Sequence, residues 1–189
     1  MKWLLLPIAF LLLAGCVSGQ SSKTRTQSLA PGISLRLPTE PVFGLGPDVV
    51  QLVQARYRDQ HQVFQSFVQS SPGRFVITMA VPSGPHIMQI EWSHDGITAQ
   101  RAAIAPKALS AERTLADLML VYASTMDLRA ALSGAQVIEG PGGERKIVQN
   151  GKDVIVVKRP VSNPWSGTAT LMNFASDYAL KIQSQRAAP

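Results

Sequence analysis

The sequence predicts a mainly β protein with a short helical interval in the middle of the chain. Apolar and polar residues alternate along many short segments, which is the period of a half-buried strand. Turn pairs such as Asp95-Gly96 and Asn150-Gly151 separate these segments, as in antiparallel hairpins. We expect about ten or eleven strands, and strands at this spacing favour a curved antiparallel sheet or barrel.

The first half of the chain contains most of the alternating segments. A phase slip among the apolar residues of 50–57 predicts a β-bulge there. The spacing in 63–68 fits a helix as well as a strand, and its β-branched and aromatic content favours the strand. Turns are expected at 71–73 and 82–85. The expected strands are 33–37, 50–57, 63–68, 75–81, 88–92 and 97–101.

The helical interval begins after Ser110, a candidate N-cap followed by Glu112 in the first turn. Apolar residues then recur at helical spacing, namely Leu115, Leu118, Met119 and Tyr122. A second short helix is expected after Ser124 and should stop at Gly134. The chain then returns to strands, at 135–139, 145–149, 154–158, 165–174 and 178–182.

The N-terminus has the pattern of an export signal. A basic residue precedes the apolar run 3–13, which is too short to span a membrane as a helix because that takes about 20 residues. The following Leu13-Ala14-Gly15-Cys16 resembles the bacterial lipobox, which implies cleavage after Gly15 and lipidation of Cys16. The alternative is an ordinary secretory signal with a chance cysteine, but Cys16 is the only cysteine in the chain.

The expected organisation is therefore a signal peptide over 1–15, a flexible tether over 16–30 and a single domain over 31–185. The tether is predicted from its Ser, Thr, Gln and Gly content. By resemblance to enterobacterial sorting, Val17 in place of Asp favours the outer membrane. We expect a lipid-anchored protein on the periplasmic face of that membrane.

The charge distribution and the lack of catalytic or metal-binding motifs argue against several classes of function. The net charge of +6 is scattered without a basic stripe, which argues against nucleic acid as a partner. It suits either mild attraction to anionic lipid head groups or a generally solvated surface. Ser93-His94-Asp95 lie in one turn and cannot converge as a triad, and His61 and His86 show no metal-ligand pattern. We therefore expect no enzyme activity, no metal and no cofactor; the alternative is a lipid hydrolase or transferase whose groups converge in space.

Several strands are more apolar than one buried face requires, for example 75–77 and 154–157. Methionines add soft, adaptable side chains to these segments. Two interpretations fit, a plain packed core or an open cavity for acyl chains. The candidate cavity residues are Ile77, Met79, Met88, Ile90, Trp92, Leu115, Leu118, Met119 and Tyr122.

The hairpin 75–92, with Val81-Pro82-Ser83-Gly84 between its strands, resembles the corresponding hairpin of the LolB family of outer-membrane lipoprotein receptors. The chain is more similar to an uncharacterised family of small LolB-like lipoproteins, often encoded beside fatty-acid or aryl-polyene synthesis genes. That pattern is echoed by 112–118, 128–132 and 164–167, and the resemblance covers about 50–184. It implies an incomplete antiparallel β-barrel closed by helices, holding acyl-lipid or lipoprotein cargo received from a periplasmic LolA-like carrier.

One departure from the LolB pattern concerns the turn at 82–84. LolB-like receptors carry an exposed leucine in this loop, whereas this chain has Ser83 between Pro82 and Gly84. A hydroxyl does not enter a bilayer as leucine does, although Pro82, Ser83 and Gly84 remain the candidate membrane or cargo loop. The alternative to lipid binding is a scaffold or assembly lipoprotein that docks an envelope complex through its surface.

Overall fold

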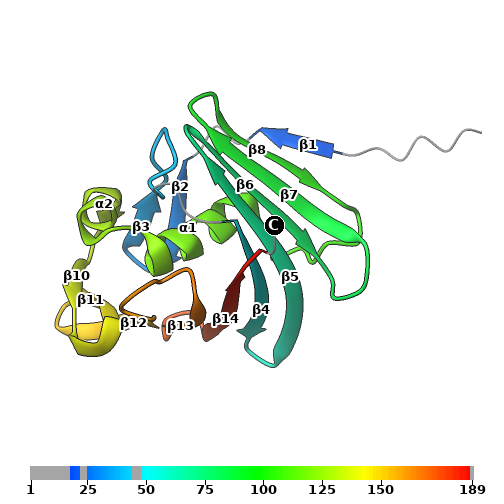
Figure 1. Ribbon diagram of the computed structural model, residues 1–189. Helices are drawn as coiled ribbons and strands as arrows, with labels where there is room; N and C mark the ends of the chain where they lie inside the picture. Colours follow the sequence, from blue (N-terminus) through cyan, green and yellow to red (C-terminus); the bar gives the residue numbers. More distant parts are fainter. Residues whose placement is uncertain (1–17, 22–24, 44–47, 188–189) are drawn as a thin grey trace, which may run out of the picture.

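The computed structural model describes residues 18–21, 25–43 and 48–187, and in these ranges the chain is mainly β with two α-helices (Figure 1). The prediction of a mainly β fold with helices in its middle is confirmed. The helices are α1 (Ala111–Tyr122) and α2 (Thr125–Ala131), with a 3-10 turn at Pro141–Gly143. The strands are β1 (Ser18–Ser21), β2 (Thr26–Ala30), β3 (Ile33–Arg36), β4 (Val49–Tyr57), β5 (Gln60–Ser71), β6 (Arg74–Ala80), β7 (His86–Ser93), β8 (Gly96–Arg101), β9 (Leu132–Ser133), β10 (Gln136–Glu139), β11 (Glu144–Gln149), β12 (Lys152–Lys158), β13 (Gly167–Asn173) and β14 (Tyr178–Arg186).

Eleven strands form one large antiparallel sheet in the order β1-β8-β7-β6-β5-β4-β14-β13-β12-β11-β10. The pairing of β4 with β14 joins the two halves of the chain, with Val49 opposite Arg186 and Tyr57 opposite Tyr178. The sheet curves around α1 (Figure 1). Over the described residues it stays open, with β1 and β10 as its edge strands.

Helix α1 is the centre of the molecule. It begins as expected at Ser110, whose hydroxyl oxygen accepts a hydrogen bond from the backbone N–H of Arg113 at 3.2 Å. Every residue from Leu115 to Tyr122 is buried, so the helix has no solvent-facing side. The small sheet β2-β3-β9 supplies further apolar cover, including the fully buried Leu35.

Two details of the strand and helix predictions are wrong. Strand β4 pairs with β5 and β14 without a register shift, so the bulge is absent. The apolar pattern of 50–57 slips because Leu52 is an apolar residue on the outer face of the sheet, where it is 37 % exposed. Helix α2 ends at Ala131, and Leu132 instead pairs with Leu35 in the small sheet.

The range expected to be a flexible tether contains β1 and β2. Strand β2 forms a hairpin with β3 around Pro31-Gly32, where Gly32 has a φ of +74°. Leu29 is only 2 % exposed, so burial of its side chain holds this segment on the domain. The folded domain therefore begins before residue 31. Gly15 and Cys16 lie outside the described residues, and no helix within the described ranges is long and apolar enough to cross a membrane.

Candidate functional site

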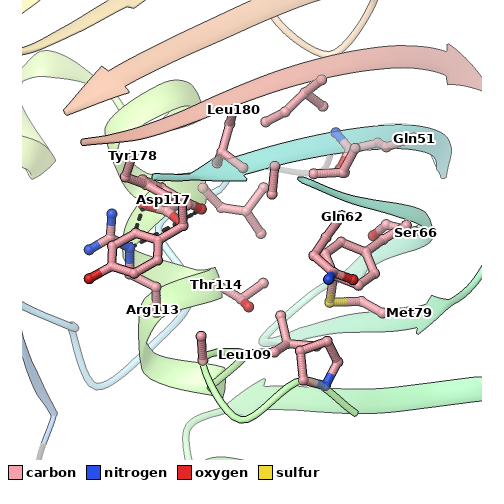
Figure 2. Close-up of a pocket in the computed structure, with 18 of the residues that line it drawn as sticks. Gln51, Gln62, Ser66, Met79, Leu109, Arg113, Thr114, Asp117, Tyr178 and Leu180 are labelled. Carbon is pink, nitrogen blue, oxygen red and sulfur yellow. Dashed lines mark hydrogen bonds and ion pairs between the residues drawn. The ribbon is translucent and has the colours of Figure 1, made fainter. Parts of the chain in front are cut away.

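The candidate site is a cavity of about 150 Å³ between α1 and the concave face of the large sheet (Figure 2). Strands β4, β5, β6 and β14 supply one wall, and α1 with residues 106–109 supplies the other. Alternation along the strands turns every second side chain inward, which explains the mostly apolar wall. The apolar lining residues include Val53, Ala55, Phe64, Ile77, Met79, Leu109, Leu118, Leu180 and Ile182.

The cavity is buried at one end and reaches solvent at the other. Gln51 and Ser66 line its inner part and are 2 % and 3 % exposed. Tyr57, Gln60 and Gln62 also line it and are exposed. The mouth therefore lies where β4 ends and β5 begins.

A charged cluster lies in the cavity wall (Figure 2). The Nε of Arg113 donates to Asp117 Oδ2 at 3.2 Å, and the Tyr178 hydroxyl donates to the same oxygen at 2.7 Å. The Arg113 guanidinium also lies over the Tyr178 ring, 4.3 Å from its centroid. Burial raises the pKa of Asp117, against the opposing effect of Arg113 and of the Tyr178 hydrogen bond. Burial, with the charge of Asp117, raises the pKa of Tyr178 well above its usual value.

At the inner end of the cavity, Gln51 joins a buried polar group. Its side-chain nitrogen donates to the hydroxyl oxygens of Tyr122 and Ser184, each at 3.0 Å. The Tyr122 ring stacks on Trp165 with the centroids 3.9 Å apart. These contacts fix the closed end of the cavity, because the side-chain nitrogen of Gln51 and the hydroxyls of Tyr122 and Ser184 are partners of one another.

The predicted cavity residues divide into three groups. Ile77, Met79 and Leu118 line the cavity. Met88 lines a small hollow of about 20 Å³, and Tyr122 lines a wider cleft of about 600 Å³ near Trp165. The remaining four pack in the core away from the cavity and are fully buried, namely Ile90, Trp92, Leu115 and Met119.

Sequence reasoning missed most of the wall, because β4, β5 and β14 contribute residues that no local pattern distinguishes from core. It also missed the charged cluster. A signal was present, since Asp117 interrupts the apolar stretch of α1 and Arg113 precedes it by one helical turn. The turn residues Pro82, Ser83 and Gly84 are exposed, and none of them lines the cavity.

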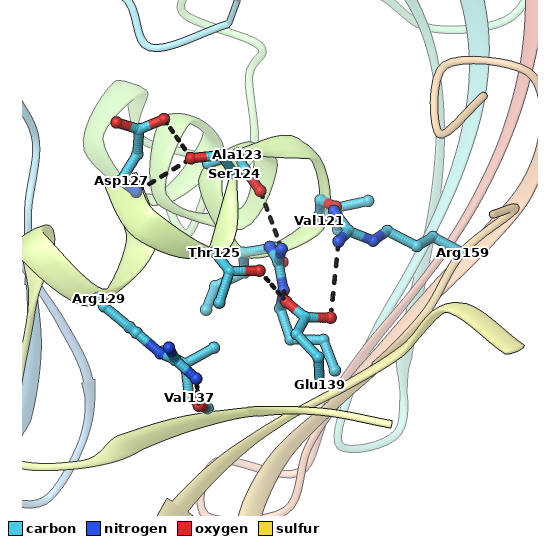
Figure 3. A network of polar contacts seen from close by, with 11 residues as sticks. Val121, Ala123, Ser124, Thr125, Asp127, Arg129, Val137, Glu139 and Arg159 are labelled. Atoms are coloured by element: carbon cyan, nitrogen blue, oxygen red, sulfur yellow. Dashed lines mark hydrogen bonds and ion pairs between the residues drawn. The ribbon is translucent and has the colours of Figure 1, made fainter. Parts of the chain in front are cut away.

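A second polar network ties α1 to the sheet (Figure 3). Arg145 is 0 % exposed and donates to the carbonyl oxygens of Leu120 and Ala123, each at 2.9 Å, and to Glu139 Oε1 at 2.6 Å. Arg159 donates to the carbonyl oxygen of Val121 at 2.8 Å. Two cations thus satisfy the last carbonyls of α1, where the helix dipole is negative.

The site offers an apolar wall together with the hydrogen-bonding groups of Arg113, Asp117 and Tyr178. Across the described ranges, no three His, Cys, Asp or Glu side chains gather as a metal site would require. His61, His86 and His94 are all exposed, and His94 contacts only its neighbour Asp95, at 3.0 Å, among the ion pairs of the described residues. What the arrangement can do is remove an apolar group from water.

The fold and the cavity define a class of protein in which an open, curved antiparallel sheet wraps a buried helix and leaves an apolar cavity beside it. Residues 48–186 match the family model described as "Protein of unknown function (DUF3261)", and the chain belongs to this family. The chain matches none of the curated proteins.

Proposed function

We propose that this protein is a lipid-anchored outer-membrane lipoprotein that shelters an acyl chain, or a ring of similar width, in the cavity beside α1. The observation that carries the proposal is the mostly apolar cavity with one buried and one exposed end. An open sheet around a helix also suits the incomplete barrel that a LolA/LolB-like fold would have. Lipidation of Cys16, and delivery of cargo by a periplasmic LolA-like carrier, are parts of the same proposal.

The size of the cavity limits the cargo. An apolar cavity of about 150 Å³ in another protein holds one benzene molecule, and this cavity has a similar volume of about 150 Å³. It can therefore take one ring or a short stretch of one acyl chain as it stands. The whole acyl moiety of a lipoprotein would require the walls to move apart, so a slender cargo is favoured.

The charges in the wall limit the cargo further. Arg113 and Asp117 form an ion pair within the wall, so together they contribute no net charge. An ionised head group entering the cavity would leave water without gaining a free counter-charge, which is unfavourable. The proposal therefore favours a chain whose buried part is uncharged.

Native mass spectrometry with lipid extraction tests this function. The mature chain without Cys16 would be expressed in the periplasm, purified and then offered decanol as an acyl probe. We expect co-purified lipid or decanol uptake. Ala55→Phe should reduce uptake about tenfold by filling the cavity. Ala179→Phe, on the outer face of β14, is the matched control and should bind as the wild type does. A wild-type chain that carries no lipid and takes up no decanol would refute the proposal.

A scaffold function is the second candidate, and one surface favours it. Leu52, Val63 and Phe67 lie on the outer face of β4 and β5 and are 37 %, 42 % and 41 % exposed. Adjacent exposed apolar side chains are a common feature of protein interfaces. Crosslinking in membranes followed by affinity purification should recover one stoichiometric partner if this function holds, and Phe67→Asn should reduce that recovery.

A further inference from the structure

Strand β1 determines where the N-terminal segment leaves the folded domain. Ser18 pairs with Arg101 and Ser21 pairs with Thr98, so the chain, followed back toward its start, runs to the end of β8. Cys16 precedes Ser18 by two residues, which span at most about 7 Å. A lipid on Cys16 would therefore be attached beside the end of the sheet at which β8 finishes.

The same end of the sheet carries the cavity mouth, and we call it the mouth end. It consists of the β4–β5 turn, the β6–β7 turn and the segment 102–109 that follows β8. The backbone N–H of Ala102 donates to the carbonyl oxygen of Ile87 at 2.9 Å, which holds the segment against the start of β7. Pro106, Ala108 and Leu109 of this segment line the cavity.

Within the mouth end, the segment 102–109 presents one large exposed apolar side chain on a well-ordered backbone. Ile104 is 65 % exposed, whereas the next residue, Ala105, is 5 % exposed. Arg101 Nη2 donates to the carbonyl oxygens of Ala105 and Pro106 at 2.7 and 2.8 Å. Single exposed apolar residues are common on protein surfaces. What distinguishes Ile104 is its place in the segment that runs from the end of β8, beside β1, to the cavity-lining residues Pro106, Ala108 and Leu109.

We propose that Ile104 inserts into the bilayer surface to which Cys16 is anchored, so that the cavity mouth faces the membrane. This inference rests on the proposed lipidation of Cys16. Lys107 is exposed in the same segment, and a lysine there would meet anionic lipid head groups. Insertion is thereby assigned to the segment after β8, and not to the turn at 82–84, whose exposed residues are Pro82, Ser83 and Gly84.

Depth-dependent fluorescence quenching tests the orientation. Full-length Ile104→Cys protein, lipidated in the cell, would be labelled with an environment-sensitive fluorophore and reconstituted into phosphatidylcholine–phosphatidylglycerol vesicles. Lipidation consumes the Cys16 thiol, so the introduced cysteine takes the label. Asp95→Cys is the matched control, because Asp95 is exposed in the β7–β8 turn at the opposite end of these strands.

We expect the label at position 104 to shift to the blue and to be quenched by lipids with spin labels on their acyl chains. Quenching should be at least fivefold weaker at position 95. Equal quenching at the two positions, or none at 104, would overturn the inference. A blue shift of the unlipidated Cys16→Ser protein in buffer, without vesicles or detergent, would also overturn it, because another copy of the chain would then cover position 104. If mass spectrometry finds no lipid on Cys16, the anchor of the proposed function fails instead.

Discussion

Replacement of Arg145 by methionine should strongly destabilise the domain. The guanidinium is buried and donates to two carbonyl oxygens at the end of α1 and to Glu139. Methionine keeps much of the volume but leaves both carbonyls without these donors. Hydrogen bonds from a charged donor contribute about 1.5–3 kcal/mol each, and breaking a buried charged contact typically costs about 3–5 kcal/mol. Since removal of the cation also ends its desolvation cost, we expect a loss of about 3–5 kcal/mol.

Urea unfolding followed by tryptophan fluorescence would measure this loss, with thermal unfolding as a second measure. A domain of this size loses about 2–4 °C in Tm per kcal/mol, so the expected fall is about 6–20 °C. Arg145→Lys should lie between the two proteins, since one ammonium cannot reproduce the forked geometry of the guanidinium. Arg129→Met is the control, because Arg129 is exposed and, within the described residues, its guanidinium donates one hydrogen bond, to the carbonyl oxygen of Val137 at 3.0 Å. If Arg145→Met unfolds at the wild-type urea concentration, the helix-end contacts do not stabilise the fold and the reasoning is wrong.

Three further predictions follow from single residues. Burial raises the pKa of Glu139, but hydrogen bonds from Thr125 and Arg145 and two positive charges lower it overall. Its stabilisation is therefore complete above the unfolded pKa of about 4.3 and is lost as the pH falls through the lower folded value. Glu139→Gln should remove this acid dependence in urea unfolding across pH 3–6. Ser110→Ala should cost about 1 kcal/mol through loss of the α1 cap, and an unchanged urea midpoint would contradict that. Gly134→Ala should destabilise the domain more than Gly73→Ala. Both glycines have positive φ, but an added Cβ at Gly134 would strike the carbonyl oxygen of Gly32, whereas at Gly73 it meets open space.

The sequence predicted correctly those elements that depend on interactions between residues close together in the chain. Ser110 caps α1 because its side chain reaches a backbone N–H within the same turn. Asn150 and Gly151 both adopt positive φ, at 51° and 73°, as a two-residue hairpin requires. Where the cause lay elsewhere in the chain, local reasoning failed. The sequence of β2 has the polar composition of a linker, and only its contacts with the rest of the domain, which bury Leu29, make it a strand.

The cavity shows the same division. Strand alternation assigned Ile77 and Met79 to the inward face of β6, where they line the cavity. The same alternation assigned Ile90 and Trp92 to the inward face of β7, where they are fully buried in the core. The alternation along a strand predicts on which face of the sheet a side chain lies, but not whether a cavity or the core lies against that face. That depends on the path of α1 across the sheet, which no single segment encodes.

The pairing of β4 with β14 makes folding depend on a strand that is synthesised after all the other strands described in the structure. Val49 cannot find its partner Arg186 until almost the whole domain is available, and contacts so distant in sequence form slowly. Helix α1 has no solvent-facing side between Leu115 and Tyr122, so it gains most of its stability only once the sheet surrounds it. A chain crossing a membrane N-terminus first would therefore stay unfolded until β14 emerged. If the chain is exported, as the proposed function requires, this delay would keep it unfolded while it crosses the membrane.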